Sequence, residues 1–233
     1  MPPDADEARD EVRDSWKVRL PEMPGHIVVV VAERTLEADG IISLKLVAAD
    51  GGPLPSFEAG AHIDVHVGGL IRQYSLCNDP TERHRYRLGV LLEGESRGGS
   101  QGMHRLSVGQ HVRISLPRNN FHLTGTARHS ILAAGGIGIT PLIAMAHRLQ
   151  AIGASFEFHY CTRTRSRAAF LEELLRSKFS AKIHTHHDDG EKEQIFTAER
   201  FLSQPASDTH LYVCGPTGFM NYVTNGASAL GWH

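Results

Sequence analysis

The chain has 233 residues, 41% of them hydrophobic, and a formal net charge of −2 with both signs interspersed. This composition excludes a basic nucleic-acid-binding surface and a polybasic membrane-binding segment, and no apolar run approaches the roughly 20 residues of a bilayer-spanning helix. We therefore expect a cytoplasmic, monomeric protein of two globular domains of about 100 residues each, with small-molecule ligands.

The first 24 residues are rich in Asp, Glu, Arg and Pro, which predicts a mobile N-terminal extension. Short apolar or alternating segments follow, separated by Gly, Pro, Asp and Asn, and we expect them to be strands. They cover residues 26–34, 41–48, 62–67, 71–77, 86–92 and 111–116. Strands at this spacing predict an antiparallel β-barrel domain over residues 25–125.

Segment 71–80 carries the first candidate binding site. Alternation places Arg72 and Tyr74 on one side of a strand, and Gln73 and Ser75 on the other. A guanidinium fork, a flat phenol ring and a small hydroxyl suit a flat, phosphorylated ligand. An ordinary strand with an exposed Arg and a packed Tyr is the alternative interpretation.

A glycine-rich turn at residues 95–106 is the second candidate. Arg97, Gly98, Gly99 and Ser100 precede a short predicted helix, and we expect Ser100 to be its N-cap. Backbone N–H groups at a helix start, a hydroxyl and an arginine together suit a phosphate. A purely structural glycine loop leading into a capped helix is the alternative.

The pattern changes near Gly125. Compact apolar segments at 130–134, 155–160, 181–185 and 210–213 alternate with helical segments at 141–150, 167–177, 197–202 and 217–230. This repetition predicts a parallel, doubly wound α/β domain over residues 126–233.

Two segments at predicted strand ends are candidates for binding a dinucleotide. The first holds Gly135, Gly136, Gly138, Thr140 and Pro141, with Thr140 expected as N-cap and Pro141 as the first helical residue. Glycines let backbone amides approach a pyrophosphate, although the match to Gly-x-Gly-x-x-Gly is incomplete and a structural turn is the alternative. The second segment is Cys214, Gly215 and Pro216, where a buried, inert cysteine is the alternative.

Charged and ligating side chains follow the next two predicted strands. Arg163 and Arg165 suit the 2′-phosphate of NADPH, and a solvated basic turn is the alternative. Residues 184–189 combine His and Asp, but their spacing does not suit a metal, and we expect them to face water. The three cysteines are widely separated, which argues against a disulfide framework and a thiolate metal cage.

The segments 72–76, 135–141 and 214–216, in this order, resemble the motifs of the ferredoxin-reductase superfamily, and most closely those of the phthalate dioxygenase reductase group, which includes vanillate demethylase reductases. The resemblance covers residues 26–233. It implies a flavin-binding barrel followed by a nucleotide-binding domain, with FMN favoured over FAD and NADH over NADPH. It also implies that Ser75 and Cys214 lie beside the reacting rings. The cofactor-binding residues would be Arg72, Gln73, Tyr74, Ser75, Arg97, Gly98, Gly99, Ser100, Gly135, Gly136, Gly138, Thr140, Pro141, Arg163, Arg165, Cys214, Gly215 and Pro216.

The same resemblance predicts hydride transfer from the nicotinamide to the flavin and then single electrons to an iron–sulfur acceptor, ultimately a Rieske-type oxygenase. Members of the group carry a plant-type 2Fe–2S domain with a Cys-x4-Cys-x2-Cys pattern, and this sequence contains none of its ligands. We expect either a fragment of a three-domain reductase, which we favour, or a reductase that serves a separate ferredoxin. A free flavin reductase and a non-catalytic flavin or nucleotide sensor are the alternatives.

Overall fold

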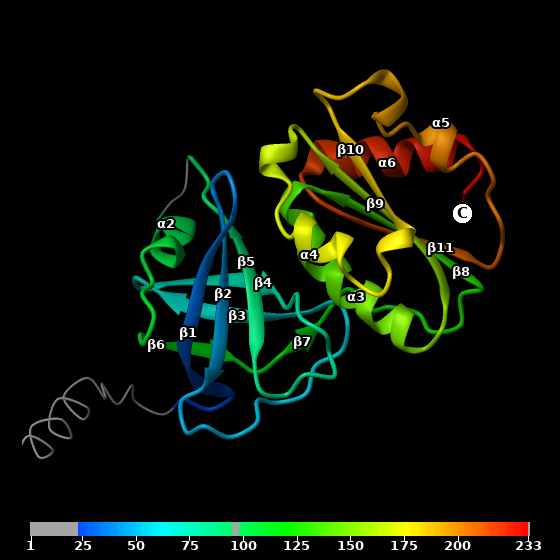
Figure 1. Ribbon diagram of the computed structural model, residues 1–233. Helices are drawn as coiled ribbons and strands as arrows, with labels where there is room; N and C mark the ends of the chain where they lie inside the picture. The colour runs from blue at the N-terminus through cyan, green and yellow to red at the C-terminus, as the bar shows by residue number, and fades with distance from the viewer. Residues whose placement is uncertain (1–22, 95–97, 233) are drawn as a thin grey trace, which may run out of the picture.

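The computed structural model describes residues 23–94 and 98–232 (Figure 1). Most of the predicted N-terminal extension and the candidate residue Arg97 lie outside these ranges. Among the described helices, none is long and apolar enough to cross a membrane.

An antiparallel sheet forms the first half of the structure (Figure 1). Its strands are β1 (His26–Ala38), β2 (Ile41–Ala48), β3 (Ala61–Val67), β4 (Leu70–Ser75), β5 (Tyr86–Leu91), β6 (His111–Ser115) and β7 (Arg118–Asn119). The order is β4-β3-β6-β1-β2-β5, and an isolated bridge between Leu76 and Leu88 brings the two end strands together. The predicted antiparallel barrel is therefore confirmed.

Side-chain alternation explains why these segments form a barrel. Along β3, Ala61, Ile63, Val65 and Val67 are buried, and the residues between them are only partly buried. Each strand can therefore contribute one apolar face to the barrel core. The long loop between β2 and β3 is anchored by Tyr86, whose buried hydroxyl donates to the carbonyl of Pro55 at 2.5 Å.

A parallel sheet in the order β10-β9-β8-β11 forms the second half. Its strands are β8 (His129–Gly135), β9 (Ser155–Thr162), β10 (Ile183–His187) and β11 (Thr209–Cys214), and its helices are α3 (Ile139–Ala151), α4 (Leu171–Leu175), α5 (Ala198–Phe201) and α6 (Thr217–Ala229). Buried residues of α3 and α4 pack on one face of the sheet, and those of α5 and α6 on the other. The predicted doubly wound sheet is confirmed.

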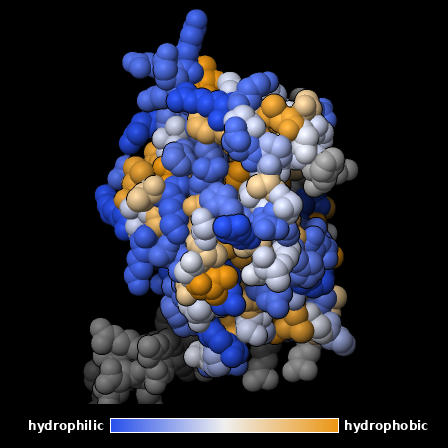
Figure 2. Space-filling view, turned by 90° about the vertical axis from the view of Figure 1, so that its right-hand side faces the viewer, coloured by the Kyte–Doolittle hydropathy of each residue, from blue (hydrophilic) through white to orange (hydrophobic). Residues whose placement is uncertain are grey.

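One continuous apolar cluster connects the two halves. It includes barrel residues such as Ile63 and Leu88 together with Leu142 and Met145 of α3. On the face drawn in Figure 2, hydrophilic residues cover most of the described surface, and hydrophobic residues form small, separate groups.

Helix α4 is shorter than predicted. We expected a helix over residues 167–177, but α4 spans only Leu171–Leu175 and follows a 3-10 turn at Arg165–Arg167. The cause is Phe170, which has a left-handed backbone with φ 62° and is the only described non-glycine residue with positive φ. A helix cannot pass through this conformation.

The histidines of residues 184–189 were predicted to face water, and this prediction is wrong for His186. Its side chain is buried, because β10 continues to His187 and directs His186 towards Phe196 and Phe201. His186 Nδ1 donates to the Gln194 carbonyl at 2.7 Å, so its Nε2 accepts from His159 Nδ1 at 3.0 Å. Burial lowers the pKa of His186 to about 4.

This burial predicts a pH-dependent stability. The folded protein favours the neutral His186 ring, whereas the unfolded ring takes up a proton below its ordinary pKa of about 6.5, so stability is lost as the pH falls from about 6.5 towards 4. We expect protonation of His186 to lower the free energy of unfolding by at most about 2 kcal/mol. Urea midpoints of the wild-type protein and His186→Gln, each measured near pH 7 and near pH 5, test this expectation. Equal losses in the two proteins would contradict it.

Candidate functional site

A small cavity of about 260 Å³ lies where the barrel meets the parallel sheet. Three of the segments selected from the sequence line it: Gln73, Tyr74 and Ser75 from β4 and its end, Pro141 from α3, and Cys214 from β11. The remaining lining residues are Gly60, His62, Asn120 and Phe121. A larger cleft of about 1,040 Å³ shares none of these residues.

Strand β4 presents its residues as the alternation predicted. Ile71 and Gln73 are exposed, whereas Arg72 and Tyr74 are partly buried. Burial raises the pKa of Tyr74 to about 12, so its phenol stays protonated at neutral pH and can donate a hydrogen bond.

Arg72 reaches the glycine-rich turn before α2 (Gly99–His104). A Cβ atom on Gly99 would lie 2.4 Å from Arg72 Nε, so the guanidinium group can pack there only because residue 99 has no side chain. Gly98 precedes the helix in a left-handed conformation with φ 97°, which glycine adopts without strain. The structure thus brings Arg72, Gly98 and Gly99 together.

Ser100 is not the N-cap that we predicted. The helix begins at Gly99 with Gly98 as its N-cap, so Ser100 lies inside the helix and is buried. Its hydroxyl accepts a hydrogen bond from the backbone N–H of Glu93 at 3.2 Å. Because the N-cap is Gly98 and not Ser100, the helix begins two residues earlier than we predicted.

The two glycine segments of the parallel sheet touch through their backbones. A Cβ atom on Gly138 would lie 2.3 Å from the Cys214 carbonyl oxygen and 2.4 Å from Gly215 N. A Cβ atom on Gly215 would lie 2.9 Å from Gly135. Because β8 and β11 are parallel neighbours, both segments lie at the carboxyl edge of the sheet, where such folds bind ligands.

The predicted cap of α3 is also wrong. The helix begins at Ile139 after a 3-10 turn at Gly136–Gly138, and Thr140 is its second residue. Thr140 Oγ1 donates to the Ile137 carbonyl at 3.1 Å, a bond that the 3-10 turn makes possible. Pro141 is the third residue of the helix. It still lies in the first turn, where backbone N–H groups have no hydrogen-bond partner within the helix, so proline is tolerated there.

Cys214 lines the cavity as a protonated thiol. Burial raises the pKa of this thiol above its ordinary value. The chemistry available to Cys214 is therefore contact and weak hydrogen bonding.

Arg163 and Arg165 lie outside this cavity, at the end of β9. Both are exposed, and Arg165 lies 3.8 Å from a carboxylate oxygen of Glu172. The neighbouring Thr162 hydroxyl is already hydrogen-bonded to the Thr164 carbonyl and to His187.

Sequence reasoning missed Asp188 at the same edge. The backbone N–H of Asp188 donates to the Thr162 carbonyl at 3.1 Å, so an exposed carboxyl group from the end of β10 lies beside the end of β9. Burial, and then this carboxylate, raise the pKa of the Cys161 thiol to about 12. We had expected this strand at 181–185, two residues before its actual position. A predicted strand that ended at His187 would have placed Asp188 as the first residue after it.

Comparison with known proteins identifies similar chains. Residues 132–225 match the family of oxidoreductase NAD-binding domains. A vanillate O-demethylase oxidoreductase of Pseudomonas sp. strain HR199 is 50% identical over 208 residues, which cover 88% of this chain and 66% of that protein. The phthalate dioxygenase reductase of Burkholderia cepacia is 40% identical over 206 residues, or 87% of this chain and 64% of that one.

The similarity extends to three dimensions. A solved phthalate dioxygenase reductase, described as a modular structure for electron transfer from pyridine nucleotides to 2Fe–2S, superimposes with a TM-score of 0.83 and 39% identity. The match covers 88% of this chain and 64% of that one. This chain thus spans slightly less than two thirds of the length of these relatives.

The contact between the glycine segments yields a prediction. We expect Gly138→Ala to lower the free energy of unfolding by about 1–3 kcal/mol, because the new methyl group overlaps the rigid backbone of Cys214 and Gly215. Gly218→Ala is the control, since its Cβ atom meets nothing within 4 Å and alanine favours the helix. Urea denaturation measures both, and a Gly138→Ala protein as stable as Gly218→Ala would contradict the prediction.

Proposed function

Because this chain belongs to the phthalate dioxygenase reductase group of the ferredoxin-reductase superfamily, we propose that it is an NADH-dependent flavin oxidoreductase. The observation that carries the proposal is the shared cavity, which Tyr74 and Ser75 line from the barrel and Pro141 and Cys214 line from the parallel sheet. A flavin held by one domain and a nicotinamide held by the other would meet there.

The residues present suit FMN. Tyr74 offers a flat, half-buried ring with a protonated hydroxyl, and Ser75 adds a small hydroxyl beside it. Arg72, packed against Gly99, offers a guanidinium group of the kind that binds a phosphate. We propose that these residues, with Arg97, Gly98 and Ser100, hold the flavin.

The bound cofactors would supply the redox chemistry, with hydride passing from nicotinamide to flavin and single electrons leaving the flavin. The side chains position the rings and exclude water. Ser75 and Cys214 would contact the reacting rings without changing protonation state. The raised pKa of the Cys214 thiol favours this role, because a neutral thiol adds no charge beside the nicotinamide.

We infer that NADH is the preferred nucleotide. In doubly wound folds, a carboxylate at the adenosine end accepts from the ribose 2′-hydroxyl, and it repels the 2′-phosphate of NADPH. Asp188 supplies such a carboxylate next to the end of β9. Arg163 and Arg165 would favour NADPH, but Arg165 lies near Glu172, which offsets part of its charge.

The electron acceptor is inferred from the relatives. Two of them are named for vanillate O-demethylase and phthalate dioxygenase systems, and the solved relative is described as passing electrons to 2Fe–2S. We propose that this chain forms the flavin and nucleotide domains of a reductase component. An iron–sulfur centre would then pass electrons to a Rieske-type oxygenase.

An anaerobic titration with NADH tests the proposal. We expect the purified protein to show a flavin absorption spectrum that bleaches with stoichiometric NADH, and the flavin released by acid to be FMN. A flavin that NADH and NADPH both fail to reduce would refute hydride transfer and leave a binding module. A flavin that dissociates and is consumed as a substrate would instead indicate a free flavin reductase.

The nucleotide preference has its own test. We expect Asp188→Asn to raise the ratio of kcat/KM for NADPH to that for NADH about tenfold or more, because the variant removes one repulsive charge from the 2′-phosphate site. Asp189→Asn is the matched control, since Asp189 is adjacent and also exposed but its N–H makes no bond to β9. Equal ratios in the two variants would rule out Asp188 as the selecting residue.

A further inference from the structure

The two domains also meet away from the cavity, around strand β5. The Phe170 ring, at the start of α4, lies against Gly89, where a Cβ atom would be 3.0 Å from Phe170 Cζ. The methyl group of Thr140, in α3, would lie 2.7 Å from the same Cβ atom. Only a glycine at position 89 permits this contact between β5 and the nucleotide domain.

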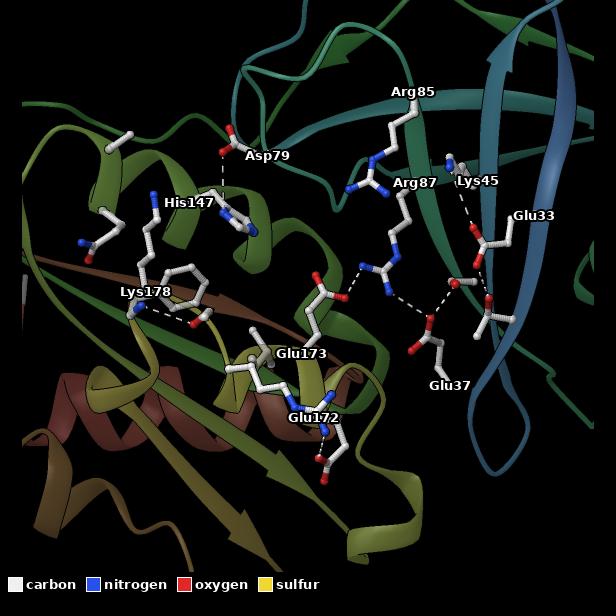
Figure 3. A pocket seen from close by; sticks show the side chains of 18 residues that line it. Glu33, Glu37, Lys45, Asp79, Arg85, Arg87, His147, Glu172, Glu173 and Lys178 are labelled. Atoms are coloured by element: carbon white, nitrogen blue, oxygen red, sulfur yellow. Dashed lines mark hydrogen bonds and ion pairs between the residues drawn. The ribbon is translucent and has the colours of Figure 1, made fainter.

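Arg87, two residues earlier in β5, spans the same junction. Its guanidinium group bonds Glu37 of β1 at 2.9 Å and Glu173 of α4 (Figure 3). It also lies 4.6 Å from the centre of the Phe170 ring. The Ser43 hydroxyl donates a hydrogen bond to the Glu37 carboxylate and so holds it in place. The pair of Arg87 with Glu37 lies within the barrel, whereas the pair with Glu173 crosses between domains and borders the cleft of about 1,040 Å³.

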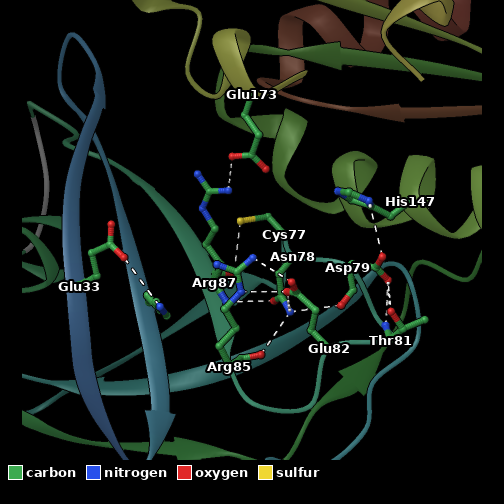
Figure 4. Close-up of polar contacts among 11 residues, drawn as sticks. Glu33, Cys77, Asn78, Asp79, Thr81, Glu82, Arg85, Arg87, His147 and Glu173 are labelled. Carbon is green, nitrogen blue, oxygen red and sulfur yellow. Dashed lines mark hydrogen bonds and ion pairs between the residues drawn. The ribbon is translucent and has the colours of Figure 1, made fainter. Parts of the chain in front are cut away.

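The backbone of Arg87 is tied to the segment that follows Ser75. Its N–H donates to Asn78 Oδ1 at 3.0 Å, and its carbonyl accepts from the Cys77 N–H at 3.0 Å and from the Cys77 thiol at 3.2 Å (Figure 4). A shift of Arg87 is therefore transmitted to the end of β4. On the other side, Thr140 connects Gly89 directly to α3, which carries Pro141 into the cavity.

We propose that Arg87, Glu173 and Phe170 form an interdomain latch that sets the separation of the two domains across the cavity. This inference rests on the proposed function, since it assigns these three residues as positioning residues for hydride transfer. Hydride transfer depends steeply on the distance and orientation of the two rings. None of the latch residues lines the cavity, so we assign the latch to the spacing of the two domains around it.

Two features favour a latch over an ordinary surface ion pair. Phe170 keeps a left-handed backbone that bulky residues rarely adopt, and this conformation places its ring on Gly89. The Arg87 side chain is only 14% exposed and would keep Glu37 if Glu173 were lost. Removing the Glu173 charge should therefore release the interdomain half of the network without leaving a buried charge unpaired.

The test compares Glu173→Gln with Glu172→Gln. Both residues lie on α4, but Glu172 is 68% exposed and pairs only with Arg165 and Arg176 among the described residues. In anaerobic single-turnover experiments, we expect Glu173→Gln to slow flavin reduction by NADH about three- to tenfold, with unchanged dissociation constants for FMN and NAD⁺. Glu173→Asp should restore part of the rate, and Glu172→Gln should match the wild type.

Hydrogen exchange provides a readout that does not need the loaded enzyme. In flavin-free protein, we expect Glu173→Gln and Phe170→Ala to accelerate exchange at β5 and at the start of α4, and Glu172→Gln to leave β5 unchanged. An unchanged hydride-transfer rate in Glu173→Gln, or an equal slowing in Glu172→Gln, overturns the latch. If NADH fails to reduce the wild-type flavin, the proposed function fails. The latch is then tested separately, because unchanged exchange at β5 in flavin-free Glu173→Gln would refute it.

Discussion

Direct backbone contact between two strand ends is the constraint on which the rest of this structure depends. Gly138 lies against the peptide bond between Cys214 and Gly215, at a distance that no side chain would allow. This contact fixes the first turn of α3 and therefore places Pro141 beside Cys214 in the cavity. Glycine at position 138 is thus a structural requirement of this packing.

The cavity is lined by groups that stay uncharged at neutral pH. The pKa values of Tyr74 and Cys214 are both raised by burial, so neither group ionises near pH 7. The charged residues lie further out, with Arg72 at the glycine turn and Asp188 at the far edge of the sheet. In the function that we propose, two uncharged rings would meet in the cavity, and the charged residues would face phosphate and ribose groups.

Local patterns predicted the architecture well, because alternation in strands such as β3 and strand–helix repetition depend on burial of the residues themselves. The errors arose where neighbours in space decided the outcome. Thr140 resembled an N-cap, but a 3-10 turn that no local pattern indicates moved the helix start. Phe170 shortened α4 because its ring packs on Gly89, which lies far away in the sequence. Asp188 was missed because a two-residue error in the end of a strand changes which residue lies at the carboxyl edge of the sheet.

The apolar cluster that runs through both sheets has a further consequence for how the chain unfolds and how it can be divided. A Cβ atom on Gly60 of the barrel would lie 3.0 Å from Met145 Cε of α3, and Met145 belongs to the same continuous core as the neighbouring barrel residues Ala59 and Ala61. The barrel and the parallel sheet should therefore denature in one cooperative transition. Exchanging either domain with that of a relative would require the donor to supply a matching surface for α3, so chimeras should be designed around this helix and not around the connecting loop.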